Sequence, residues 1–233
     1  MNMKMQLAMV AGALIVTAQV HASLSSFDTG AGLYGDGVGT IDPNWTASLA
    51  AGSPNAPGPI TGSTYLVPNG TTYNANGGTY ALVPGAWAAN TLSSSWISYY
   101  SPPTLPDENG ETIQYQLQFN AASAGLIGIQ WWSDNSSTLL VNGIPVGLLN
   151  NNTFTTGTSV SGVSLNQGLN TIDVDVFNAP QGQPDWGNPE GVRVEFSGDV
   201  SAVPEASTML AGALMLLPFG MSAVRIMRRK VLA

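Results

Sequence analysis

The chain has 233 residues, of which only 9% are charged, and it contains no cysteine and a single histidine, His21. Positions 23–203 hold thirteen carboxylates, no lysine and one arginine, Arg193, which gives this part a formal charge of −12, compared with −8 for the full chain. These counts exclude disulfides, Ser-His-Asp and Cys-His catalysis, a Schiff-base lysine and an ordinary His/Cys zinc site from residues 23–203, and they disfavour nucleic-acid binding, which needs Lys and Arg.

Residues 1–22 have the pattern of a secretory signal peptide. Lys4 supplies a positive charge, and residues 7–16 form an apolar run that is too short to span a bilayer, which takes roughly 20 residues. Ala22 is the small residue expected before a cut at Ser23. We therefore expect a signal helix that signal peptidase removes on export. The alternative is a cytosolic chain that keeps an amphipathic start.

Three aspartates lie in the Gly-rich segment that follows: Asp28, Asp36 and Asp42. Residues 23–203 offer many oxygen ligands and almost no nitrogen or sulfur ligands, and oxygen is the donor that Ca²⁺ prefers. A structural calcium ion held by these three aspartates is one expectation. Their spacing is not that of an EF-hand loop, and the alternative is that they cap turns through Asx hydrogen bonds.

Several segments have the alternation of half-buried strands. Shorter strands are predicted at 65–67, 79–83 and 95–99. In residues 111–120 a period of two places four apolar side chains on one face and the glutamines on the other. These apolar side chains are Ile113, Tyr115, Leu117 and Phe119. Residues 125–132 form the next predicted strand.

A tight hairpin is predicted around Asn142 and Gly143. Apolar runs at 138–141 and 144–146 flank this pair. Asn-Gly between apolar runs is the strongest short-range signal for a two-residue hairpin turn, since both central positions need φ > 0.

Two alternating segments, 172–178 and 192–196, complete the domain. In the first, Ile172, Val174 and Val176 are expected to face inward, while Asp173 and Asp175 are expected on the solvent face. No helical period persists between the two ends of the chain, so residues 23–200 are predicted to be an all-β ectodomain. Two antiparallel sheets packed face to face, in a jelly-roll β-sandwich, would bury one face of each strand.

Residues 201–233 have three ordered parts. The motif Val203-Pro204-Glu205-Ala206-Ser207-Thr208 comes first. Residues 206–224 carry no charge and are just long enough to cross the hydrocarbon core as a transmembrane helix. The basic residues Arg225, Arg228, Arg229 and Lys230 follow, and they should stay on the cytoplasmic side, which puts the ectodomain outside.

This tail resembles the PEP-CTERM sorting signal. Val203, Pro204, Glu205, Ser207 and Thr208 match its motif, whereas Ala206 stands where the motif usually has a second proline. The resemblance implies that an exosortase recognises the Pro204-Glu205 region and that the membrane segment is removed during sorting to the surface. The alternative is an ordinary tail anchor that stays uncut.

A second resemblance covers roughly the second half of the ectodomain. WWSDN at 131–135, VNG at 141–143, GLNTID at 168–173 and GNPEGVRVE at 187–195 together are similar to the galactose-binding-like jelly rolls that often precede PEP-CTERM tails. This resemblance implies a sandwich with carbohydrate-associated relatives, and it assigns no reaction.

Tryptophans are the candidate sugar-binding residues, because sugar rings have apolar faces that stack on aromatic planes. Trp186 lies in a turn-rich loop, where Asp185 and Asn188 could bond hydroxyl groups, so these three form the predicted ligand site. Trp96 and one of the pair Trp131/Trp132 are expected in the core instead, since adjacent strand residues face opposite sides.

Carboxylate catalysis is the enzymatic alternative. Glycoside hydrolysis needs only two carboxylates, about 5–10 Å apart. Candidates are Asp134, Asp173, Asp175, Asp185 and Glu190. Because Asp173 and Asp175 are predicted on a solvent face and Asp134 in a turn, we expect a protein that is not an enzyme.

The sequence thus predicts an exported, exosortase-sorted protein of the cell surface or extracellular matrix that associates with extracellular polysaccharide. It would be membrane-anchored before processing. A carboxylate-dependent hydrolase and a structural matrix protein without a ligand remain the alternatives.

Overall fold

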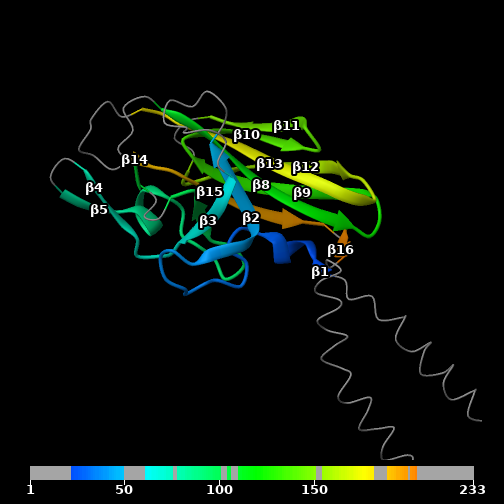
Figure 1. Ribbon diagram of the computed structural model, residues 1–233, viewed down its shortest axis with the longest axis horizontal. Coiled ribbons are helices and arrows are strands. Elements are labelled where there is room, and N and C mark those ends of the chain that lie inside the picture. Colours follow the sequence, from blue (N-terminus) through cyan, green and yellow to red (C-terminus); the bar gives the residue numbers. More distant parts are fainter. Residues whose placement is uncertain are drawn as a thin grey trace, which may run out of the picture. The chain divides into compact units, whose positions relative to one another are not determined.

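Figure 1 shows the computed structural model of the protein, which describes residues 22–49, 61–75, 78–100, 104–105, 110–150, 154–180, 188–198 and 200–203. Contacts divide the chain into a unit of Ser23–Ala202 and a second unit of Met1–Ala22 with Val203–Ala233. Within the described ranges no helix is long and apolar enough for a membrane span. The predicted signal helix and the predicted span at 206–224 lie outside those ranges, and both stay predictions.

The described residues are mainly strands. These are β1 (Ala22–Ser23), β2 (Ile41–Leu49), β3 (Thr61–Val67), β4 (Thr72–Ala75), β5 (Gly78–Ala81), β6 (Trp96–Ser98), β7 (Thr104–Leu105), β8 (Glu111–Ala121), β9 (Gly125–Asp134), β10 (Ser136–Val141), β11 (Ile144–Leu149), β12 (Thr158–Leu165), β13 (Gly168–Asn178), β14 (Asn188–Pro189), β15 (Gly191–Ser197) and β16 (Ser201–Val203). Two short helical segments accompany them, the 3₁₀ helix η1 (Leu24–Phe27) and the irregular η2 (Leu82–Ala86).

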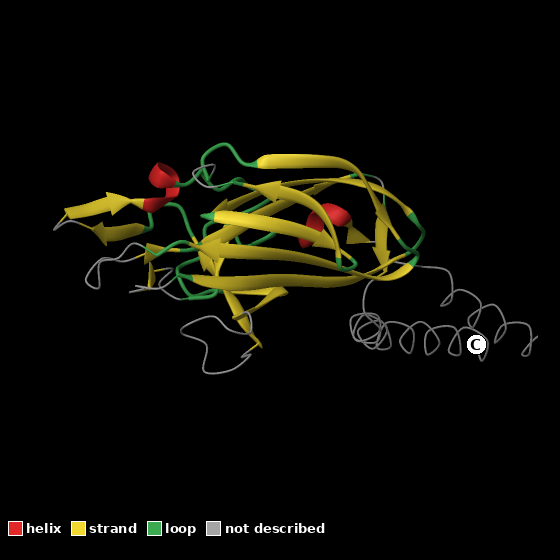
Figure 2. Ribbon diagram, turned by 90° about the horizontal axis from the view of Figure 1, so that it is seen from above, coloured by secondary structure: helices red, strands yellow, loops and turns green. Residues whose placement is uncertain are grey.

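Ten strands follow one another in a single hydrogen-bonded order: β11-β10-β13-β8-β2-β3-β6-β15-β9-β12. Every one of these pairings is antiparallel, so the predicted all-β antiparallel class is confirmed. Two separate sheets had been expected. Instead, β3 bonds to β2 on one side and to β6 on the other, so it joins the strands from β11 to β2 with the strands from β6 to β12 in one sheet. Figure 2 shows these strands packed over one another in the body of the domain.

The strongest sequence pattern gives the centre of this sheet. β8 and β13 pair along their whole length, with Ile172 opposite Leu117 and Val174 opposite Tyr115. These four side chains are fully buried. The inward faces predicted for 111–120 and 172–178 are therefore confirmed, because a period of two placed every second side chain on the same face.

The predicted hairpin is also confirmed. Asn142 and Gly143 have φ angles of 52° and 77°, as a two-residue turn between β10 and β11 requires. The Asn142 side chain holds the turn against β13. Its amide nitrogen donates to Asn170 Oδ1 at 3.0 Å, and its Oδ1 accepts from the Thr171 amide at 2.9 Å.

The two longest strands that had not been predicted are β2 and β12. The sequence Asp42-Pro43-Asn44 interrupts the alternation of β2, where the register shifts between Ile41 and Thr46. In β12 the register shifts between Val160 and Val163. The strand predicted at 79–83 ends at Ala81, because Val83, Pro84 and Gly85 take irregular backbone angles in η2.

The domain buries apolar side chains on both sides of β9. Trp131 faces β10, where its ring nitrogen donates to Ser137 Oγ at 3.1 Å. Its neighbour Trp132 lies in a separate cluster with Trp87 and Trp96, which stack with ring centroids 4.3 Å apart. Both residues of the pair are thus buried, whereas one had been expected in the core. Leu82 and Val83, which follow β5, pack in the same cluster as Trp132.

Candidate functional site

The predicted sugar-binding residues fall mostly outside the described ranges, where Trp186 and Asp185 lie. Asn188 is described, in β14, and it is only 1% exposed. Its side-chain nitrogen donates to the Ala179 carbonyl at 3.0 Å, which ties β14 to the end of β13. The role of these three residues in binding stays a prediction.

The three aspartates predicted to hold calcium have separate surroundings. Asp28 Oδ1 accepts the Phe196 amide at 2.8 Å, and Asp42 accepts the amides of Gly30 at 2.6 Å and Asn44 at 2.8 Å. Asp36 is exposed. No group of three His, Cys, Asp or Glu side chains arranged to hold a metal occurs in the described ranges. Asp42 thus makes the Asx hydrogen bond of the alternative, to Asn44, whereas Asp28 accepts an amide from a distant strand. The calcium site itself stays a prediction.

Burial changes the acidity of these two carboxyl groups. It raises the pKa of Asp28 to about 7, although the hydrogen bond from Phe196 opposes the change. It also raises the pKa of Asp42 in spite of three backbone hydrogen bonds. Both carboxyl groups hold the backbone in place, since each accepts hydrogen bonds from amides that bond to it and not to a neighbouring strand.

A surface cleft lies between two turns. Its volume is about 460 Å³, and the first wall contains Tyr34, Asp36 and Val38 while the second contains Asn69 and Thr71. Tyr34 is 48% exposed and Val38 53% exposed. The floor consists of buried side chains. These are Leu66, Asn90 and Ser95.

Glycine shapes both walls. The Asp36 amide donates to the Leu33 carbonyl at 3.0 Å, and Gly35 takes a φ of 94° at the third position of that turn. The opposite turn repeats the arrangement, with Gly70 at a φ of 89°. A positive φ at the third position is what a type II turn needs, and glycine adopts it without strain. The first turn therefore presents Tyr34 at its tip, next to Asp36.

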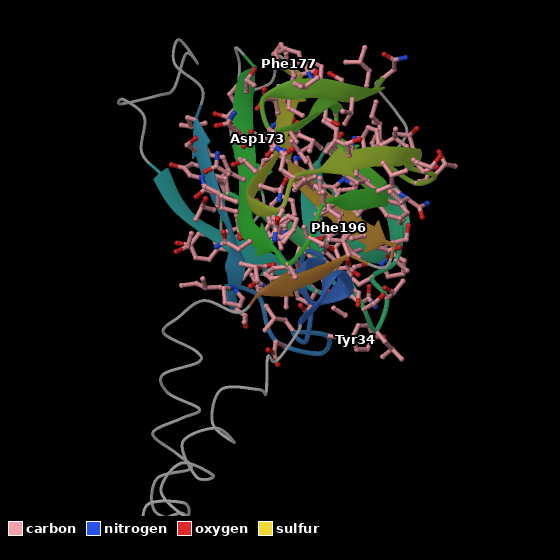
Figure 3. The ribbon with its side chains drawn as sticks, turned by 90° about the vertical axis from the view of Figure 1, so that its right-hand side faces the viewer. Tyr34, Asp173, Phe177 and Phe196 are labelled. Carbon is pink, nitrogen blue, oxygen red and sulfur yellow. The ribbon has the colours of Figure 1, made fainter. Side chains whose placement is uncertain are left out.

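The cleft offers an aromatic ring and polar groups to a ligand. Asn69 Oδ1 accepts the Asn90 amide at 3.1 Å, while Asn90 bonds the Val67 carbonyl at 2.8 Å. Asn90 is thereby fixed as part of the floor. The exposed Asp36 carboxylate can accept hydrogen bonds from hydroxyl groups. Figure 3 labels Tyr34 at one end of the domain and Phe177 at the other.

A second polar group of residues is buried at the end of the domain that carries β14. We call it the acidic end, and it consists of Glu111, Asp134, Asn178 and Glu190. Glu190 is fully buried and accepts hydrogen bonds from the hydroxyls of Ser98 and Tyr115 and, at 2.8 Å, from the Tyr99 amide. Burial raises the pKa of Glu190, and these three donors oppose the change.

Asp134 and Asn135 connect β9 with β13 in the acidic end. Asp134 Oδ2 accepts the Trp87 ring nitrogen at 2.8 Å, and its Oδ1 accepts the Asn135 side chain at 2.7 Å. Asn135 Oδ1 in turn accepts the Ala179 amide at 2.6 Å. Burial raises the pKa of Asp134 to about 7, and the charge of Glu190 adds to the effect.

Of the carboxylates weighed for hydrolysis, Asp185 lies outside the described ranges, and the other four have partners inside the domain. Asp173 accepts from Gln116 at 2.8 Å and Asp175 from Gln114 at 3.0 Å, both on the face opposite Val174. Asp173 had been expected on a solvent face, but it is only 8% exposed. Its side of the strand is as predicted, and the glutamine side chain from β8 lies across it.

Arg193, the arginine of the domain, is 3% exposed and completes the cluster around Trp132. Its guanidinium carbon lies 4.4 Å from the Trp132 ring centroid, and it forms an ion pair with Glu195 and a 2.7 Å hydrogen bond to Ser94 Oγ. Burial alone would raise the pKa of Glu195, but hydrogen bonds from Ser94 and Arg193 lower it. The Arg193 guanidinium group is therefore bound to side chains inside the domain.

The sequence had not singled out Tyr34, Glu111 or Asn178. The signal for Tyr34 was its place as an aromatic residue in the Gly-rich run that contains Asp36. Glu111 and Asn178 begin and end their strands, and each occupies an inward position where an apolar residue is the usual choice.

No protein-family model matches the chain, and no curated protein matches it. Among solved structures, a β-glucosidase from Kluyveromyces marxianus aligns with a TM-score of 0.37 and 9% identity over 75% of this chain, which spans 18% of the enzyme's length. A family 35 carbohydrate-binding module from Clostridium thermocellum aligns with a TM-score of 0.31 and 18% identity, over 55% of this chain and 98% of the module. The family 35 module of Cellvibrio japonicus Abf62 gives a TM-score of 0.28 and 16% identity, over 69% and 98%. Likenesses of this size assign no function to the chain.

Proposed function

We propose that the domain is a non-catalytic binding module that takes a sugar unit of an extracellular polysaccharide in the cleft between Tyr34 and Asn69. The observation that carries the proposal is the exposed Tyr34 ring beside the Asp36 carboxylate in a cleft of about 460 Å³. Small-molecule sites have volumes of roughly 300–1,000 Å³. We include in the proposal the jelly-roll, galactose-binding-like arrangement of the strands.

The chemistry of the cleft favours a neutral, hydroxyl-rich ligand. The Tyr34 ring can stack on the apolar face of a sugar, and its hydroxyl provides a polar contact. Asp36 can accept hydrogen bonds from neighbouring sugar hydroxyls. A polyanion would be repelled, because residues 23–203 have a formal charge of −12 and the guanidinium of Arg193 is buried.

The test is binding of the purified protein to a panel of soluble polysaccharides by calorimetry. We expect Tyr34→Ala to weaken binding about tenfold or more, which corresponds to about 1.4 kcal/mol. Phe177→Ala is the matched control, because Phe177 is an exposed aromatic residue, 42% accessible, on β13. Equal affinities of the two variants would refute the cleft as the site.

The same panel separates the alternatives. Release of sugars that a single Asp or Glu substitution abolishes would favour a hydrolase. Absence of binding to every glycan would favour a structural matrix protein.

We further propose that signal peptidase and an exosortase process the chain on its way to the surface or matrix. The support is the sequence of the tail, in which the motif, the uncharged segment and the basic residues follow one another. Val203 lies in β16, and the remainder of the tail lies outside the described ranges. Intact-mass measurement of the exported protein should give an N-terminus near Ser23 and loss of the chain after about Glu205. A mature protein that retains Arg228 and Arg229 would contradict exosortase processing and favour a tail anchor.

A further inference from the structure

The acidic end contains a buried amide without a hydrogen-bond partner. Asn178 is fully buried, and neither its Oδ1 nor its Nδ2 has a partner among the described residues. It follows Val176 by two positions on β13 and therefore points into the domain on the same side. A buried polar group without a partner costs about 1–3 kcal/mol, so such groups normally bind something.

Glu111 lies directly across from Asn178. The two residues pair in register, which places their Cβ atoms about 4.5–5.5 Å apart. Glu111 is 1% exposed, and its Oε2 accepts the Tyr100 hydroxyl at 3.2 Å. A carboxylate and an amide oxygen thus meet inside the same end of the domain.

No described basic side chain lies among the carboxyl groups of the acidic end. The Tyr100 amide donates to Ser98 Oγ at 3.0 Å, and the Ser98 hydroxyl donates to Glu190, so a short chain of contacts links Glu111 to Glu190. The only basic side chain of residues 23–203 is Arg193, which is paired with Glu195. Buried carboxylates are normally paired or coordinate metal ions.

We propose that the acidic end binds a calcium ion through the Glu111 carboxylate and the Asn178 side-chain oxygen. These donors are hard oxygens, which Ca²⁺ takes in flexible geometry and in larger numbers than Mg²⁺ accepts. Glu190 is not among the proposed ligands, since hydrogen bonds already occupy its oxygens. The site is separate from the three aspartates of the N-terminal segment and from the proposed sugar cleft.

The first measurement is thermal unfolding of the purified full chain in calcium, magnesium or chelator at matched ionic strength. Calcium at about 100 times its Kd should raise the melting temperature by on the order of 5–10 °C. Magnesium should give a smaller rise, and elemental analysis should find calcium bound to the dialysed protein. No calcium-specific rise in the wild-type protein overturns the proposal.

Asn178→Leu is the decisive variant. It replaces two buried polar atoms by methyl groups, so it should fold in chelator at least as well as the wild type. It should nevertheless lose the calcium-specific rise. Retention of the full rise in this variant would mean that calcium binds elsewhere and that Asn178 bonds an internal water.

Two further variants complete the test. Glu111→Gln keeps the shape of the side chain and should also lose bound calcium by elemental analysis. Asp36→Asn should keep the full calcium response, because Asp36 lies on the exposed turn. Loss of the response in Asp36→Asn alone would move the site to the N-terminal aspartates and refute the acidic end.

Discussion

In this domain single polar side chains accept hydrogen bonds from backbone amides that strand pairing leaves without a partner. Asp28 and Thr29 show this along β15, where Asp28 accepts the Phe196 amide and Thr29 Oγ1 accepts the Val194 amide at 3.0 Å. Asp42 does the same inside β2, at the point where the register shifts. Because unpaired buried amides are costly, these carboxyl groups remain buried even though burial raises their pKa.

Asp134 makes a residue-scale prediction about pH. Its folded-state pKa of about 7 lies above the ordinary aspartate value of 3.8, so the folded state binds more protons than the unfolded state between these two values. The contribution of Asp134 to stability is therefore present at low pH and is lost as the pH rises toward 7, by at most about 1.4 kcal/mol per pH unit.

Asp134→Asn should flatten this dependence, because the amide oxygen can still accept the Trp87 hydrogen bond. Melting temperatures measured between pH 5 and pH 7.5 check it, at matched ionic strength. An unchanged slope in the variant would show that Asp134 titrates in its normal range.

At the scale of elements, β8 and β13 act as one unit. Apart from Asn170, their inward side chains from Phe119 to Ile113 and from Ile172 to Val176 are hydrophobic, and the last pair is Glu111 with Asn178. Their outward side chains include Gln-Asp pairs such as Gln116 with Asp173. The two faces of the pair therefore have opposite chemistry, and a shift of one residue would exchange them. The difference between the two faces therefore fixes the register of β8 and β13. It also fixes the position of the Glu111–Asn178 pair, at the end of the domain that carries β14.

Val174→Asp should unfold the domain. Val174 is fully buried, and an unpaired core charge costs several kcal/mol against a total stability of roughly 5–15 kcal/mol. Asp175→Asn, one position along, should change stability by less than about 1 kcal/mol, because Asn keeps an oxygen that can accept from Gln114. Circular dichroism during thermal unfolding measures both. Similar melting of the two variants would contradict the face assignment.

At the scale of the whole molecule, the negative charge and the absence of cysteine both limit the stability of the folded state. Residues 23–203 carry a formal charge of −12, and no disulfide can constrain the unfolded chain. Self-repulsion of this size destabilises a compact state, and dissolved salt screens it over about 10 Å at 0.1 M ionic strength. The large share of buried tryptophan compensates, since five of the six tryptophans are buried among the described residues.

Sodium chloride should therefore stabilise the protein in the absence of divalent cations. We expect the melting temperature in chelator to rise by a few degrees as ionic strength increases through the physiological range. Differential scanning calorimetry provides the measurement. A constant or falling melting temperature would indicate that attractive pairs such as Arg193 with Glu195 outweigh the net repulsion.

The sequence alone determined the fold class, the inward faces of β8 and β13 and the turn at Asn142-Gly143, because alternation and turn chemistry are local properties of the chain. It did not reveal β2 or β12, whose alternation is interrupted at Asp42-Pro43-Asn44 and at Gly162. Those strands form because neighbouring strands and side-chain carboxylates supply partners from distant parts of the chain.

Only the tertiary structure decided where the candidate sites lie. Tyr34 and Asn69 line the same cleft although they are 35 positions apart, and strand pairing brings Glu111 opposite Asn178 across 67 positions. A composition rich in Asp suggests cation binding, but it cannot distinguish an aspartate that caps an amide from a carboxylate that faces an unpaired side chain. That distinction depends on which groups each oxygen contacts, and folding brings those contacts together from distant parts of the sequence.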